Sequence, residues 1–226
     1  MRILHRILFR LFIVGFFPLA LAACVSSSVE QLRKAPIGLL AEGETIVVLG
    51  RRQNFRHQTE KDFTRCVYDN LIGQDLPVKP ERQFMDEMFP WFQPRTAPLT
   101  AEALAARLQE PVIAERLQDI GTRYVVWLDG ITRRGEDGGT MSCSVGVGGG
   151  ACLGLLWWED DAEYEAVIWD MQTLKSMGKI AVEASGTSYV PAVIIPIPLL
   201  APTQSAACRG VARQIGDFLE ENRQSP

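Results

Sequence analysis

The alternation of apolar and polar side chains along the chain predicts both strands and helices. Runs rich in β-branched and aromatic residues predict strands at residues 44–50, 123–129, 163–169 and 179–184, and the uncharged stretch 140–156 predicts a further extended segment. Apolar positions at helical spacing predict helices at residues 61–72, 100–108, 111–120 and 203–221. This order favours an α/β (α+β-like) sandwich, in which helices cover a mixed, largely antiparallel sheet.

Individual residues refine the ends of these elements. Thr100 is a good N-cap for the helix that follows it, and Pro111 occupies a first helical turn, where proline is tolerated. Gly121 is suited to end that second helix. Residues 77–98 are rich in proline and aromatic side chains, and no regular element is predicted there. Residues 189–202 are predicted to be extended because four prolines exclude a helix.

The first residues have the pattern of an export signal. Arginines at positions 2, 6 and 10 precede an uncharged apolar run at 11–23. This run is too short for a membrane-spanning helix, which needs about 20 residues. The run ends in Leu21-Ala22-Ala23-Cys24, which resembles the lipobox of bacterial lipoproteins. The resemblance implies that residues 1–23 are removed and that Cys24 is acylated, so that lipid holds the chain on a membrane.

The lipobox also suggests a location and a domain organisation. Val25 follows the cysteine, and the absence of Asp there implies the outer membrane, with the protein facing the periplasm. We expect residues 24–43 to be the acylated cysteine and a tether, and residues 44–226 to be a single α/β domain. Without residues 1–23 the net charge is −7, with no basic stripe, which argues against nucleic acid as a partner.

Two longer motifs resemble known periplasmic domains. "IGTRYVVWLDG" and "AVIWDMQTLKSMGKIAVEASG", after a buried strand and an amphipathic helix, are similar to the α/β domain of curli-secretion-type lipoproteins and to the TolB amino-terminal domain. The turn at residues 170–175 lacks the Thr-Gly pair usual in that group. The chain also resembles small envelope lipoproteins of unassigned activity, so the resemblance implies a fold and no functional residue.

Candidate catalytic residues are few. His57 is the one histidine outside the signal, it lies in a polar segment, and no Gly-x-Ser-x-Gly motif accompanies it. Cys66 is predicted on the apolar side of its helix, where thiols are usually inert. A run of carboxylates lacks the ligand spacing of a calcium loop and is better explained as a solvated strand edge: Glu159, Asp160, Asp161, Glu163 and Glu165. We therefore predict no enzyme activity, no metal and no cofactor.

The glycine-rich stretch "SCSVGVGGGACLGLLWWEDD" invites a nucleotide-binding interpretation. Its Gly-x-Gly-x-x-Ala pattern binds dinucleotides when it joins a strand to a helix, and no helix start follows it here. A hairpin fits better, because a turn at Val147-Gly148 places Cys143 opposite Cys152. By elimination Cys66 and Cys208 form a second candidate disulfide, and four free thiols remain the alternative.

These observations predict a non-enzymatic binding or assembly component of the envelope, whose partner is another envelope protein or a second copy. The candidate contact surface is the far part of the hairpin: Val147, Leu153, Leu155, Trp157 and Trp158. Residues 189–202 are either a second contact surface or buried beneath the terminal helix. The alternatives are an outer-membrane oligomer or secretion accessory that inserts its hairpin, and a periplasmic enzyme that uses His57, Cys66 or the acidic run.

Overall fold

The computed structural model describes residues 25–34, 38, 40–51, 58–93, 96–147 and 149–220, and these residues form six strands and five helices. The strands are β1 (Val25–Arg33), β2 (Thr45–Gly50), β3 (Val78–Lys79), β4 (Thr122–Gly146), β5 (Gly149–Asp170) and β6 (Lys175–Ile194). The helices are α2 (Lys61–Ile72), α3 (Glu81–Glu87), α4 (Ala101–Leu108), α5 (Pro111–Asp119) and α6 (Thr203–Glu220).

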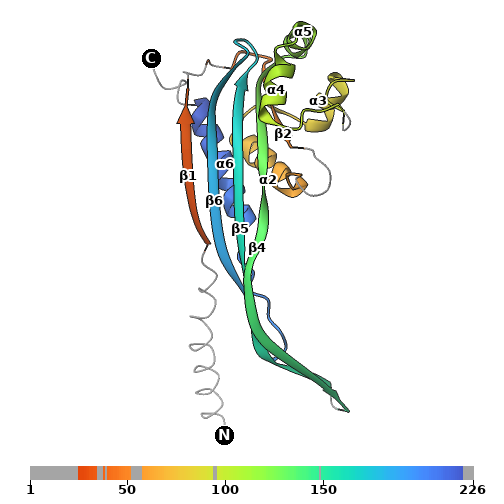
Figure 1. The fold of residues 1–226 in the computed structure, drawn as a ribbon, viewed down its shortest axis with the longest axis vertical. Coiled ribbons are helices and arrows are strands. Elements are labelled where there is room, and N and C mark those ends of the chain that lie inside the picture. The colour runs from red at the N-terminus through yellow and green to blue at the C-terminus, as the bar shows by residue number, and fades with distance from the viewer. Residues whose placement is uncertain are drawn as a thin grey trace. The chain divides into compact units, whose positions relative to one another are not determined.

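The strands make one mixed sheet in the order β1-β6-β5-β4-β2-β3 (Figure 1). β2 runs parallel to β3 and to β4, with Val48 beside Val126. β4, β5 and β6 are neighbours joined by short turns, so they run antiparallel to one another. The predicted mixed and largely antiparallel sheet is confirmed.

Helices cover both faces of the parallel part of the sheet. Val47 and Val125 lie in a buried cluster with Phe84, Leu104 and Leu117, which come from α3, α4 and α5. Successive strand residues point to opposite faces, so the even-numbered residues of β2 face the other side. α2 lies on that side, since a Cβ on Gly50 would stand 2.6 Å from the hydroxyl of Thr64.

The chain divides into two compact units. Unit 1 contains Val25 and Ser26, residues 133–161, and residues 185–203, while unit 2 contains residues 27–132, 162–184 and 204–220 of the described chain. The division arises because β4, β5 and β6 are much longer than predicted, and their far halves pack mainly among themselves.

Within the residues expected to form a tether, Val25–Arg33 is a strand at one edge of the sheet. Ser26 and Ser185 are joined by a hydrogen bond of 2.9 Å between hydroxyls, and the Lys34 amide donates to the Met177 carbonyl at 2.9 Å. These two contacts show that β1 runs antiparallel to β6. The serine-rich sequence hides the strand because its side chains are almost all exposed, so no apolar alternation marks it.

The helical predictions agree closely with the structure. The Thr100 hydroxyl accepts from the Ala103 amide at 3.1 Å, and Pro111 is in the first turn of α5. Residues 77–98, for which no element was predicted, contain β3 and α3. Proline at position 80 stands just before α3, where it interrupts no helical hydrogen bond.

Candidate functional site

The outer parts of β4 and β5 form a hairpin within unit 1. Cys143 and Cys152 form a disulfide with a Cα–Cα distance of 4.0 Å, which is the predicted pairing. A Cβ on Gly150 would lie 3.6 Å from the Val145 side chain, so Val145 and Gly150 are neighbours, as in the predicted register. β4 ends and β5 begins within the glycine motif, and among the described residues no helix directly follows it on which a pyrophosphate would bind.

Two glycines in this hairpin are required by its backbone. Gly139 has φ of +98°, and a Cβ there would stand 2.1 Å from the Leu155 carbonyl oxygen. Gly154 has φ of +149°, and a Cβ there would stand 2.2 Å from the Thr140 carbonyl oxygen. Only glycine, which has no Cβ, fits at these two positions. The glycines of the hairpin therefore shape its two strands.

The end of the hairpin exposes large apolar side chains. Val147 is fully exposed, Val145 is 90% exposed and Leu153 is 70% exposed, while Leu155 and Leu156 are also exposed. Since successive strand residues point to opposite faces, Leu153 and Leu155 lie on one face of the ribbon and Leu156 on the other. Apolar side chains are therefore presented on both faces.

Trp157 and Trp158, which were predicted in the same contact surface, are half-buried. A Cβ on Gly138 would stand 3.0 Å from the Trp157 indole nitrogen, so that ring packs against the opposite strand. The Trp158 indole donates to Asp160 at 3.0 Å, and the Arg134 guanidinium lies 4.9 Å from its ring centre. Both rings are thus held by contacts within unit 1, at the border between the charged and uncharged parts of the hairpin.

A second apolar segment of unit 1 was only partly anticipated. The amide of Tyr189 donates to the Leu199 carbonyl at 2.9 Å and the Leu199 amide returns a bond of 2.7 Å, which closes a loop. At its tip Val193, Ile194 and Ile195 are 75%, 66% and 71% exposed, so burial beneath the terminal helix is wrong for them. Pro191 lies within β6 and Pro196 pairs with Ala192 in an isolated bridge, so the segment turns back on itself.

Exposed apolar residues are concentrated in unit 1. Of the 16 large hydrophobic side chains that are exposed in the described chain, 10 belong to unit 1, although unit 2 contains most of the described residues. Contiguous apolar surface on a soluble protein usually marks a site of interaction. The candidate contact surface therefore consists of two apolar segments of unit 1, at 145–156 and 193–200.

The structure describes only part of the predicted catalytic candidates. His57 lies outside the described residues, and Cys66 is in a disulfide and has no thiol to act as a nucleophile. Among the carboxylates, Glu165 forms an ion pair of 2.5 Å with Lys179 at the surface. In the described part of the chain no three His, Cys, Asp or Glu residues are grouped so as to hold a metal ion.

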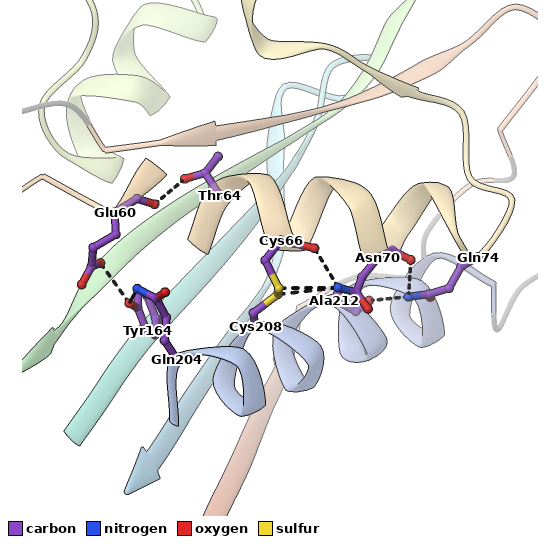
Figure 2. The surroundings of a disulfide bond; sticks show 9 residues. All are labelled: Glu60, Thr64, Cys66, Asn70, Gln74, Tyr164, Gln204, Cys208 and Ala212. Carbon is purple, nitrogen blue, oxygen red and sulfur yellow. Dashed lines mark hydrogen bonds between the residues drawn. A yellow bond between two sulfur atoms is a disulfide. The ribbon is translucent and has the colours of Figure 1, made fainter. Parts of the chain in front are cut away.

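Unit 2 is held by a disulfide between its two longest helices, Cys66 of α2 and Cys208 of α6 (Figure 2). Asn70 lies beside the bridge and donates to the Cys66 carbonyl at 2.8 Å. Near the start of α2, the Tyr164 hydroxyl donates to the Glu60 carboxylate at 2.9 Å, and burial raises the pKa of that hydroxyl well above its ordinary value. These contacts hold α2 against α6 and against the sheet.

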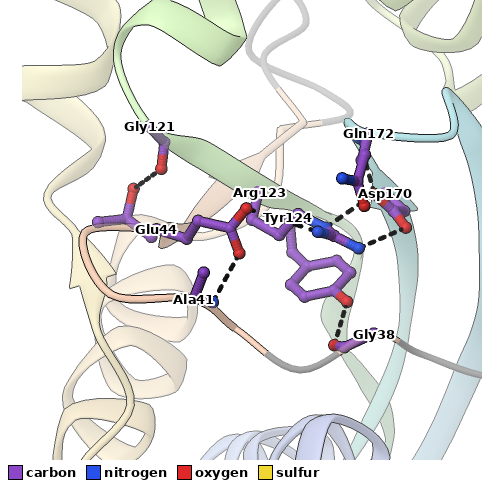
Figure 3. A network of polar contacts seen from close by, with 9 residues as sticks. Gly38, Ala41, Glu44, Gly121, Arg123, Tyr124, Asp170 and Gln172 are labelled. Atoms are coloured by element: carbon purple, nitrogen blue, oxygen red, sulfur yellow. Dashed lines mark hydrogen bonds and ion pairs between the residues drawn. The ribbon is translucent and has the colours of Figure 1, made fainter.

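Figure 3 shows a buried arginine of unit 2 within a network of polar contacts. Arg123 on β4 forms an ion pair with Asp170, at 3.0 Å from Nε to Oδ1, and both side chains are less than a tenth exposed. Glu44 lies 3.5 Å from the same guanidinium and accepts from the Ala41 amide at 2.8 Å. The neighbouring Tyr124 hydroxyl donates to the Gly38 carbonyl at 2.6 Å. The group ties two strands to the segment that precedes β2.

In the described part of the chain no helix is both long enough and apolar enough to cross a membrane. No protein-family model matches the sequence, and no curated protein does. Among solved structures, the chain is similar to the PelC dodecamer from Paraburkholderia phytofirmans, with 12% identity, a TM-score of 0.38, and coverage of 86% of this chain and 98% of that one. A variant of the same dodecamer, in which one leucine is replaced by methionine, matches with 13% identity, a TM-score of 0.37, and coverage of 86% and 99%.

Proposed function

We propose that this chain is a lipid-anchored, non-enzymatic protein of the bacterial envelope, and that unit 1 binds another protein chain, either a second copy or a different envelope protein. The observation that carries the proposal is the concentration of exposed apolar side chains in unit 1. Leaving this many apolar groups in water is unfavourable, and a partner that covers them gains about 25 cal/mol for each Å² removed from water.

The position of the lipid supports this assignment. Val25, the residue that follows Cys24, already belongs to unit 1, and a Cβ on Gly186 of the same unit would lie 3.0 Å from its side chain. Acyl chains on Cys24 would therefore hold unit 1 close to the bilayer surface, with no tether between them. A partner of unit 1 would accordingly be bound at the membrane.

The edges of the hairpin favour a protein over the bilayer interior as its partner. The pairing of β4 with β2 ends at Leu128, so beyond that residue one edge of β4 has no strand beside it among the described strands. Unpaired backbone groups are strongly disfavoured in hydrocarbon, whereas a second protein chain can satisfy them by adding a strand.

One observation favours the alternative that the hairpin enters the membrane as an anchor. Residues 138–158 carry no charge, and the stretch ends in two tryptophans, which prefer the membrane–water interface. The two proposals differ in what holds the chain on the membrane: lipid on Cys24 in the first, and the hairpin as well in the second.

Replacing the acylated cysteine separates them. With Cys24→Ser, and export preserved by an ordinary cleavable signal, we expect the chain to move almost completely from the membrane pellet to the soluble fraction. Loss of several acyl chains removes nearly all of the membrane affinity, since each buried CH₂ contributes about 0.8 kcal/mol. Fractionation followed by immunoblotting measures this, with the unaltered chain as control. Retention of the Cys24→Ser chain in carbonate-washed membranes would contradict the proposal and support insertion.

A further inference from the structure

Unit 2 contains a cavity whose described lining comes from residues 48–81, which do not include the apolar hairpin. Its volume is about 320 Å³, and it lies where β2 ends and α2 begins. One face of α2 forms a wall, because Lys61, Thr64, Arg65 and Tyr68 follow one another at helical spacing. Ligands of open α/β sheets commonly bind beyond the carboxyl ends of parallel strands, and β2 is parallel to both of its neighbours.

The charges around this cavity oppose the charge of the whole chain. Its described lining contains three cations, Arg51, Lys61 and Arg65, and one carboxylate, Glu81, although the chain as a whole has 27 acidic and 23 basic residues. Arg51 is fixed in place by Asp129, whose carboxylate oxygens lie 2.9 and 2.6 Å from its Nη1. Lys61 and Arg65 are exposed and one helical turn apart. Their two positive charges therefore belong to the exposed part of the cavity lining.

The rest of the described lining combines three polar side chains with apolar and aromatic surface. Val48 and Pro80 contribute hydrocarbon surface, and the ring of Tyr68 is half-buried on the same helix face as the two cations. A small volume with a few polar groups and apolar walls is the usual composition of a site for a small molecule. A simple inorganic ion would leave the apolar walls without a contact.

We propose that this cavity binds a small organic anion, with a carboxylate or phosphate group at Lys61 and Arg65 and a ring or short apolar body against Tyr68, Val48 and Pro80. Lys61 supplies a mobile ammonium and Arg65 a planar guanidinium, and both form charge-assisted hydrogen bonds with such anions. The inference is independent of the proposed contact made by unit 1.

Phenyl phosphate is a suitable probe, because it joins a phosphate to a single ring. In a titration of the ¹⁵N-labelled chain without its signal, we expect saturable shifts of the amide resonances of residues 58–68. Inorganic phosphate and phenol, which each supply one half of the probe, are expected to bind more weakly. The variant Lys61→Gln/Arg65→Gln should bind phenyl phosphate at least about tenfold more weakly, since the loss of even one charged hydrogen bond has about that effect.

The matched control removes the same charge elsewhere on unit 2. Lys175→Gln/Arg213→Gln alters two exposed cations outside the cavity lining, and we expect it to leave the affinity unchanged. Equal weakening in both double variants would overturn the site, since it would reduce the effect to general electrostatics. Absence of saturable shifts with phenyl phosphate, or equal affinity for inorganic phosphate, would overturn it as well.

Discussion

Removing the disulfide between Cys66 and Cys208 should lower the free energy of unfolding of unit 2 by about 5 kcal/mol in the chain-entropy model. The bridge joins residues separated by 142 positions, so without it the unfolded chain gains the freedom of a very long loop. A loss of this size approaches the whole stability of an ordinary domain, which is about 5 to 15 kcal/mol. For a chain of this length it corresponds to a fall in Tm of about 10 to 20 °C.

The measurement is thermal and urea unfolding of Cys66→Ala/Cys208→Ala, followed by circular dichroism. The chain provides its own control in Cys143→Ala/Cys152→Ala, which opens a ring whose ends are only 9 positions apart. That smaller ring contributes about 3 kcal/mol in the same model, and its removal acts on unit 1. If the two double variants lower the free energy of unfolding equally, the long bridge does not stabilise the protein by reducing the entropy of the unfolded chain.

Breaking the buried ion pair of Arg123 should be nearly as costly. Asp170→Ala leaves a guanidinium that is about nine-tenths buried with only the more distant Glu44 as a charged partner among the described residues. Uncompensated charges of this kind typically lower the free energy of unfolding by about 3 to 5 kcal/mol.

A second substitution distinguishes a buried charge from a simple cavity. Arg123→Leu/Asp170→Leu removes both charges and is expected to recover most of the loss in urea unfolding, since a hydrophobic pair often replaces a buried ion pair without penalty. Lys179→Ala, which breaks an exposed pair with Glu165, should cost less than about 1 kcal/mol. If the double variant is no more stable than Asp170→Ala, the uncompensated charge is not the cause.

Local chemistry made much of the fold predictable. The bounds of α2 at Lys61–Ile72 follow from its apolar spacing, and the start of α4 follows from Thr100, because capping and periodicity depend on neighbouring residues. The disulfide of the hairpin was predictable for the same reason, since a tight turn fixes which residues face each other.

Other features depend on partners that are distant in sequence. The strand Val25–Arg33 has no apolar alternation, and only its pairing with β6 makes it a strand. Charged residues at 133–137 and 159–161 hid the continuity of β4 and β5, whose far halves are exposed on both faces. The cavity was not predicted because its cations come from the end of β2 and from α2, and only the fold brings Arg51 near Lys61 and Arg65.

The central claim is that the apolar side chains of unit 1 contact another protein, and covalent capture tests it most directly. A photoreactive phenylalanine derivative in place of Leu153, which is 70% exposed, is compared with the same residue in place of Val112, which is 53% exposed on α5 of unit 2. Illumination of intact cells should join the chain to a protein of discrete mass from position 153 and not from position 112. Adducts from both positions alike, or none from position 153 in a folded and membrane-bound chain, would contradict the account.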